Sequence, residues 1–299
     1  MLSLPLLHTY TNTSAWWHWH LHPEVHLFCI VLEVAYLYAV TQLPGMVPDV
    51  GRVKRSQVIL YSLGVFSIWL AAASPLHDVS ESFLLSAHML EHAIYTLISA
   101  PLLLAGIPSW LWQIPLRWRG VLPVARVIVH PLSALFIVNM ALVILHLPWF
   151  MDFALYHHPW HFFFHVILVV TAMIMWWPVL STVPELPRAS YPAQMAYLFV
   201  QSLIPTVVAS FITFSDSTVY PFYATVPRLW GLSPLADQQL GGGIMKTMGA
   251  LIIWWFIGLA FFRWYRATQA EENGLRLSDV HRELVEMGLG SPAAEREQK

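Results

Sequence analysis

Charged side chains are scarce in this sequence. Asp, Glu, Lys and Arg make up 11% of the 299 residues, whereas 57% are hydrophobic and the mean hydropathy is +0.58. An ordinary soluble domain carries roughly 25% charged residues. A chain this apolar would expose too much hydrophobic surface in water, so lipid is the expected solvent for most of it. With 15 basic and 17 acidic residues, it also lacks the positive charge that a nucleic-acid partner requires.

Cysteine and the common catalytic motifs are nearly absent as well. The single cysteine, Cys29, excludes an intrachain disulfide and a metal cage built only from thiolates. No glycine-rich phosphate loop with a lysine and no G-x-S-x-G elbow occurs, so we do not expect an enzyme. The apolar start, residues 1–7, lacks the basic segment and cleavage site of a signal peptide, and we expect the first spanning helix to direct insertion.

Apolar runs of spanning length recur along the chain. Seven can be identified, separated by breaks rich in proline and glycine, and they lie near residues 26–43, 57–74, 83–104, 127–147, 161–182, 192–214 and 241–263. The sequence therefore predicts an all-α polytopic membrane protein, a bundle of seven transmembrane helices.

The basic residues predict the orientation of this bundle. If seven spans alternate, 13 of the 15 Lys and Arg residues fall on one side, and only Arg228 and Lys246 fall on the other. The positive-inside rule makes the basic side cytoplasmic, with the N-terminus outside and the C-terminus in the cytoplasm. We therefore expect an extracytoplasmic segment rich in His and Trp (1–25), a transmembrane domain (26–266) and a polar cytoplasmic tail (267–299), in which Ser278 or Asp279 begins a short helix.

Histidine is unusually abundant and unevenly placed. With this topology, 13 of the 15 histidines fall in the outer half, and only His130 and His281 fall inside. Two pairs have the i,i+4 spacing that places both imidazoles on one helix face, His88 with His92 and His161 with His165. Two such pairs at similar depth favour a shared metal ion, although a single pair is more often an interhelical hydrogen bond.

These observations predict a metal site just beneath the outer surface. Its expected ligands are His88, His92, His146, His161, His165 and His26. Its expected auxiliary residues are Glu91, Asp237, Cys29 and Met89. Asp237 has two alternative roles, as an acceptor for an imidazole N–H or as the cap of its own, seventh helix, and Lys246 has Asp237 or Glu91 as candidate partners. The roles of His8, His18 and His20 stay open.

The donor types indicate the metal. Imidazole suits copper, zinc, iron and nickel, and the outer-face sulfurs of Cys29, Met89 and Met151 favour Cu(I). Haem is an alternative, because histidines from two helices also serve as axial ligands of b-type cytochromes. A copper transporter is a third possibility, but it would need polar groups that continue into the inner half.

Several motifs resemble one known family. The run Ser86–His92 (SAHMLEH) and the later run Pro101–Pro108 (PLLLAGIP) resemble the signature of CtaG, the seven-span cytochrome c oxidase assembly factor of bacilli and other bacteria. Further similarity lies at His130-Pro131, His146-Leu147-Pro148 with Asp152, the helix of His161 and His165, Trp176-Trp177-Pro178, and the segment 237–242.

The resemblance implies a role in the maturation of haem–copper oxidases. It implies a multi-pass protein of the bacterial cytoplasmic membrane that binds copper and supports its insertion into the catalytic subunit. The implied partners are oxidase subunit I or its assembly intermediates, with membrane lipid around the helices. It supports His88, His92, His146, His161 and His165 as ligands and does not extend to His157 or His158.

Overall fold

The computed structural model describes residues 21–45 and 53–287, and these residues are helical with no strand. Six helical segments are long and apolar enough to cross a membrane, and a seventh is formed if one bent pair counts as a single span. The spans are α1 (Pro23–Gln42), α2 (Arg55–Ala72), the Leu85–Gly106 segment, α10 (His158–Leu180), α11 (Tyr191–Phe214) and α13 (Pro234–Glu286), with the bent pair α7 (Val121–Ile128) and α8 (Pro131–Leu145). The predicted class, a multi-pass all-helical membrane protein, is confirmed. The orientation of its termini stays a prediction.

The fourth predicted span, 127–147, is not one straight helix. It divides into α7 and α8, which meet at an angle of 71°. Pro131 is the first residue of α8, and His130 before it is extended, with φ −60° and ψ 135°. A residue that precedes proline is sterically disfavoured in the α region, so α7 has to end before this pair. The sequence contains Pro131, but the run is continuously apolar, so hydropathy alone did not predict the break.

The third span contains three pieces. α4 (Leu85–Ala93) passes into a π-helical turn (Ile94–Ser99) and then into α5 (Ala100–Gly106). π-Helical turns inside α-helices occur frequently at functional sites. This one begins two residues after His92, so the wider turn lies directly below the predicted ligands.

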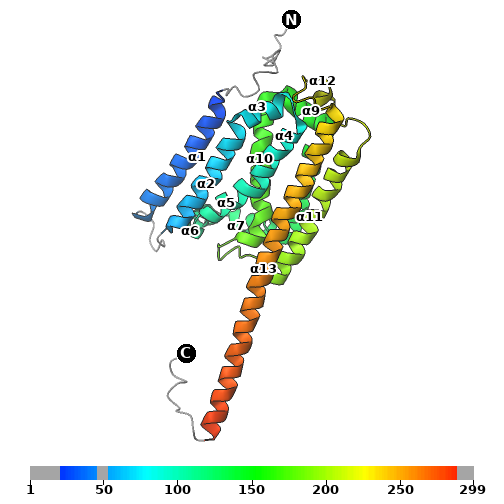
Figure 1. The fold of residues 1–299 in the computed structure, drawn as a ribbon. Helices are drawn as coiled ribbons and strands as arrows, with labels where there is room; N and C mark the ends of the chain where they lie inside the picture. The colour runs from blue at the N-terminus through cyan, green and yellow to red at the C-terminus, as the bar shows by residue number, and fades with distance from the viewer. Residues whose placement is uncertain (1–20, 46–52, 288–299) are drawn as a thin grey trace.

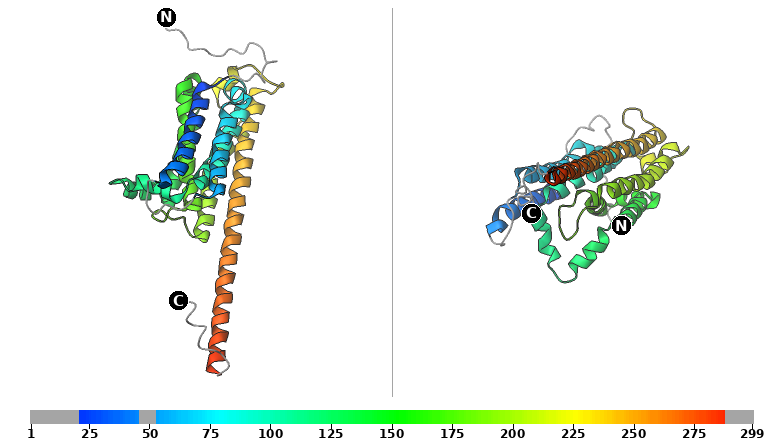
Figure 2. Two further views of the ribbon diagram at one scale, coloured as in Figure 1. Left: turned by 90° about the vertical axis from the view of Figure 1, so that its left-hand side faces the viewer. Right: turned by 90° about the horizontal axis from the view of Figure 1, so that it is seen from below.

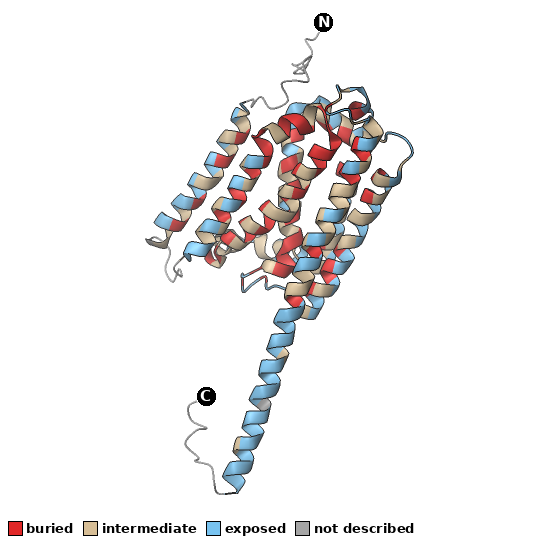
Figure 3. Cartoon of the chain, viewed as in Figure 1, coloured by how far each residue is buried: buried red, intermediate tan, exposed pale blue. Residues whose placement is uncertain are grey.

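Short helices cover the two ends of the bundle. α3 (Pro75–Ser82), α9 (Pro148–Tyr156) and α12 (Pro221–Thr225) lie at the end where the described chain begins, and α6 (Ser109–Leu116) lies at the opposite end (Figure 1). The histidine-bearing starts of α4 and α10 lie at the α3 end. Buried residues concentrate there and along the middle of the bundle (Figure 3).

The last helix is longer than its apolar run. α13 continues for 53 residues and extends well beyond the bundle (Figure 2), where its surface is exposed. The expectation that Ser278 or Asp279 starts a separate helix is wrong. Residues 264–277 contain no proline, and most of them have good helix propensity, so nothing ends the helix before that point.

Two glycines of α13 allow close helix contacts. Gly241 packs against Ser86 of α4, and Gly242 packs against α11, where an added Cβ would lie 2.8 Å from the carbonyl oxygen of Ala209. Gly243 has open space on its Cβ side. The first two positions of this glycine run therefore favour a residue without a Cβ, and the third does not.

Alanine substitutions at Gly242 and Gly243 should have different effects on stability. We expect Gly242→Ala to lower the free energy of unfolding by about 2 kcal/mol, because the backbone of α11 must move. Gly243→Ala is the matched control, and it should be neutral or stabilising by up to about 1 kcal/mol through helix propensity. Reversible unfolding of the two variants in mixed micelles measures the difference, and equal stabilities would contradict the close approach.

Candidate metal centre

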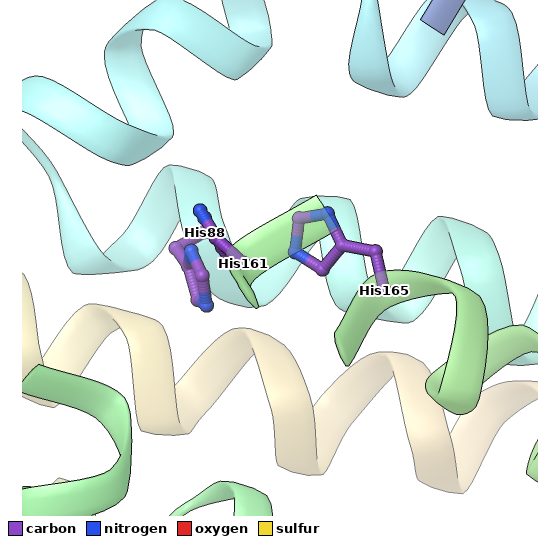
Figure 4. Close-up of side chains that lie close together, drawn as sticks. All are labelled: His88, His161 and His165. Carbon is purple, nitrogen blue, oxygen red and sulfur yellow. The ribbon is translucent and has the colours of Figure 1, made fainter. Parts of the chain in front are cut away.

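The two predicted histidine pairs face each other across the bundle. His88 and His92 lie on α4, and His161 and His165 lie on α10. His88, His161 and His165 are buried, and each offers a ring nitrogen within 4.8 Å of the others (Figure 4). This is the spacing expected of three ligands that share one ion, and the sequence spacing predicted it.

Several ring nitrogens of the two histidine pairs lack a hydrogen-bond partner among the described residues. Both ring nitrogens of His88, Nε2 of His161 and Nδ1 of His92 are buried and make no hydrogen bond. A buried polar group without a partner costs roughly 1–3 kcal/mol. The described side chains leave imidazole lone pairs unused, which a metal ion would satisfy.

Hydrogen bonds orient two of the rings. His161 Nδ1 contacts the carboxylate of Glu81, and this leaves Nε2 as the free lone pair. His146 Nδ1 donates to the carbonyl oxygen of Leu142 at 2.8 Å, which likewise leaves its Nε2 for an acceptor role. A partner that fixes the tautomer in this way is the usual companion of a metal-bound histidine.

His92 and His146 extend the group on one side. His92 Nε2 lies 3.2 Å from His165 Nε2, and the ring centroids of His92 and His146 are 5.8 Å apart. The structure thus brings five of the six predicted ligands into one continuous cluster, which we call the buried histidine cluster: His88, His92, His146, His161 and His165.

A small cavity lies at this cluster. It has a volume of about 20 Å³ and is lined by His88, His92, His161, His165 and Met151. A space of roughly 10–15 Å³ holds one water molecule, so this cavity accommodates a single ion. Met151 of α9 therefore lies beside the imidazoles and is the methionine that lines this cavity.

The other predicted sulfur donors lie elsewhere. Met89 packs toward Gly241 of α13, because it is one residue removed from the face of His88. Cys29 is buried in the apolar contact between α1 and α2, with Val25 among its neighbours. Neither residue lines the small cavity at the buried imidazoles, so their predicted auxiliary roles stay predictions.

His26 also lies outside the buried histidine cluster. Its Nδ1 donates to the carbonyl oxygen of His22 at 2.7 Å, and its ring packs edge-on against Trp69 of α2. α1 packs against α2, so this face of α1 meets an apolar neighbour. His8, His18 and His20 lie outside the described residues.

A layer of acidic residues supports the imidazoles from the α3 side. Glu91 is fully buried; its carboxylate accepts from His77 Nδ1 at 2.9 Å and from Ser80 at 2.6 Å, and it also bonds the Tyr95 hydroxyl. His165 Nδ1 lies 3.9 Å from the same carboxylate. Glu91 thus lies beside the predicted ligand His165, and its auxiliary role stays a prediction.

His77 and Glu81 of α3 belong to the same layer. Burial lowers the pKa of His77, but Glu81 and Glu91 outweigh it and raise the pKa to about 10, which makes His77 a cation at neutral pH. Burial raises the pKa of Glu81, but His77 and His161 outweigh it and hold this pKa well below its usual range. His77 therefore neutralises the two carboxylates instead of offering a lone pair.

Sequence reasoning did not assign His77 to the site. The signal was present, because His77 is one of the outer-side histidines and lies four residues before Glu81 on a short helix. What the sequence does not reveal is that α3 folds over the ends of α4 and α10.

Asp237 has neither of its two predicted roles. Its carboxylate accepts from the backbone N–H groups of Leu85 and Ser86, and from the Ser86 hydroxyl, so it caps α4 from another helix. Ser233 caps α13 itself. Lys246 donates to the Ser210 hydroxyl at 3.3 Å instead of pairing with Asp237 or Glu91. The Asp237 cap fixes the start of the helix that carries His88.

Fold and site together define a class: a polytopic helical membrane protein with a buried cluster of imidazoles beneath a carboxylate layer. Residues 34–267 match the profile of the cytochrome c oxidase caa3 assembly factors, Caa3_CtaG. The chain belongs to this family, which confirms the resemblance found in its motifs.

Curated relatives include uncharacterized proteins of Mycobacterium bovis and Mycobacterium tuberculosis. Each is 28% identical over 203 residues, which cover 62% of this chain and 30% of the relative. The chain thus spans less than a third of the length of these relatives. No solved structure shows significant similarity.

Proposed function

We propose that this chain binds copper in the buried histidine cluster and supplies it to the catalytic subunit of a haem–copper oxidase in the bacterial cytoplasmic membrane. The observation that carries the proposal is the set of unpartnered imidazole nitrogens of His88 and His161, two residues that line a cavity of about 20 Å³. Membership of a family of oxidase assembly factors supports the delivery of copper to an oxidase. Copper is the cargo here, and imidazole with a thioether is a donor set that suits it.

The same geometry suits a carrier better than a closed structural site. His88, His161 and His165 supply three ligands, and His92 and Met151 stand close enough to take over a ligand position. An ion held with an open or exchangeable position can be passed on, whereas a saturated site retains it. The role is therefore binding and delivery, without a catalytic step by this chain.

The two alternative functions fit the site less well. A porphyrin needs its two axial imidazoles on opposite faces of a large flat ring, but the cavity at these imidazoles has a volume of only about 20 Å³. A transporter needs ligands along the membrane. The larger cavity that leads inward passes apolar side chains such as Leu32, Leu103 and Val169, which offer none to an ion.

The test is the copper content of the oxidase. In a strain without this gene, we expect the purified oxidase to contain less copper per haem, and wild-type protein to restore it. The variant His161→Ala should fail to restore the copper, and His157→Ala should restore it, because His157 is exposed and its Nδ1 bonds its own helix at Phe153. Full copper content in the strain without the gene would overturn the proposal.

A further inference from the structure

A second group of potential ligands lies at the surface, next to the buried histidine cluster. His22, Glu24 and His158 each offer one ligand atom within 4.8 Å of the others. Glu24 Oε1 lies 3.5 Å from His22 Nδ1 and 3.4 Å from His158 Nε2. We propose that His22, Glu24 and His158 form a surface site that receives a divalent transition-metal ion and loads the buried histidine cluster.

The two imidazoles of this surface site are held in place by the starts of two helices. His22 caps α1 ahead of Pro23, and His158 begins α10 ahead of Pro159. Proline in the first turn has its φ preset for the helix, so both starts are well defined. The helical backbone therefore positions both imidazoles, and the site does not rely on flexible surface side chains.

His22 is oriented in the same manner as His161. Its Nε2 donates to Asp78 Oδ1 at 3.1 Å, which leaves the Nδ1 lone pair directed to Glu24. A carboxylate behind an imidazole fixes the tautomer and makes the free nitrogen a better ligand. Two buried or half-buried imidazoles in this protein thus share the arrangement typical of metal-bound histidines.

Glu81 links the surface site to the buried one. One of its oxygens lies 3.5 Å from His158 Nδ1, and the other contacts His161 Nδ1. A cavity of about 240 Å³ is lined by Glu24 and His158 at the surface and by His77, Glu81 and His165 further in. An ion that leaves His158 can therefore reach the buried imidazoles without crossing packed side chains.

The ligands of the surface site suit an ion that is bound weakly and passed on. Two imidazoles and one carboxylate suit Cu(II) or Zn(II), and the exposed His158 leaves coordination positions open to water. The carboxylates of Glu24, Asp78 and Glu81 attract cations to this end of the bundle. His22 and Glu24 precede residue 34, where the family match begins, so the family does not imply this site.

The inference rests on the proposed function, because the surface site loads the buried histidine cluster. The following experiment distinguishes failure of the surface site from failure of the proposed function. Zn(II) is the first probe, since it has no redox step. Equilibrium dialysis of the full chain in detergent should show one ion fewer per chain for Glu24→Gln and for His22→Ala. Glu283→Gln changes an exposed residue far along α13, and His157→Ala changes the exposed neighbour of His158, but the ring of His157 packs on Phe153 instead of the site; both controls should bind as wild type.

Rates provide the second measurement. Filling of the buried cluster by Zn(II), and then by Cu(II), should slow about tenfold in Glu24→Gln while its equilibrium affinity stays unchanged. Equal ion counts and equal rates in the variants and wild type would overturn the surface site and leave the buried one standing. Binding that is abolished by His22→Ala but unaffected by loss of His88 and His161 would support the surface site and refute the proposed function.

Discussion

Replacing His88 with leucine should leave the metal-free protein as stable as wild type or more stable, and should remove most of its metal affinity. His88 is 1% exposed, and neither ring nitrogen has a partner among the described residues. An apolar side chain of similar size removes two unsatisfied polar atoms, which we expect to raise the free energy of unfolding by about 1 kcal/mol. A histidine that served only to hold the fold together would show the opposite sign.

In contrast, the stabilisation of the fold by added metal should decrease in His88→Leu. In wild type, Zn(II) or Cu(I) at 100 times its dissociation constant stabilises the fold by about 2.7 kcal/mol. Loss of one ligand should weaken binding about 100-fold and abolish most of this stabilisation, because losing only the hydrogen-bond partner of a ligand already costs roughly 10–100-fold. Unfolding of His88→Leu with and without metal measures both effects, with His157→Leu as control. A variant that loses stability without metal and keeps its metal response would contradict the assignment.

The positions of most helices, and the shared helix faces of the two histidine pairs, could be predicted from the sequence. Hydropathy located the spans, and i,i+4 spacing placed His88 with His92 and His161 with His165, because both are properties of one helix. The break at His130 was the exception among the spans, since a local steric effect of Pro131 operates inside a run of uniform hydropathy.

Contacts between helices could not be predicted in the same way. Met89 has suitable chemistry, but its side chain contacts Gly241 of α13, and Cys29 is buried in a large apolar cluster. Asp237 lies 151 residues from Ser86 in the chain and caps its helix. His77 was hidden for the same reason, because its place beside Glu91 depends on how α3 folds over α4. A single sequence specifies which face of a helix is polar, but not which neighbour meets that face.

The carboxylate layer leads to the second large prediction, which concerns Glu91. This side chain has no exposed surface, and it joins His77 and Ser80 of α3 to Tyr95 of the π-helical turn. Glu91→Gln retains the shape but removes one of the two carboxylates that pair with His77, and its amide group would face three hydrogen-bond donors. Removing one partner of a buried ion pair costs about 3 kcal/mol or more. We therefore expect a loss of about 3 kcal/mol in the free energy of unfolding.

The loss of stability in Glu91→Gln should depend on pH. His77 has a folded pKa of about 10, above its unfolded value of 6.5, so its ion pairing stabilises the fold fully below pH 6.5 and is lost as the pH rises through 10. The difference between wild type and Glu91→Gln should thus shrink at high pH. Glu33→Gln is the matched control: Glu33 accepts from Ser62 on a neighbouring helix, which an amide oxygen can also do, so we expect a loss of less than about 1 kcal/mol. Equal losses for the two variants would refute the view that Glu91 holds α3 over the metal centre.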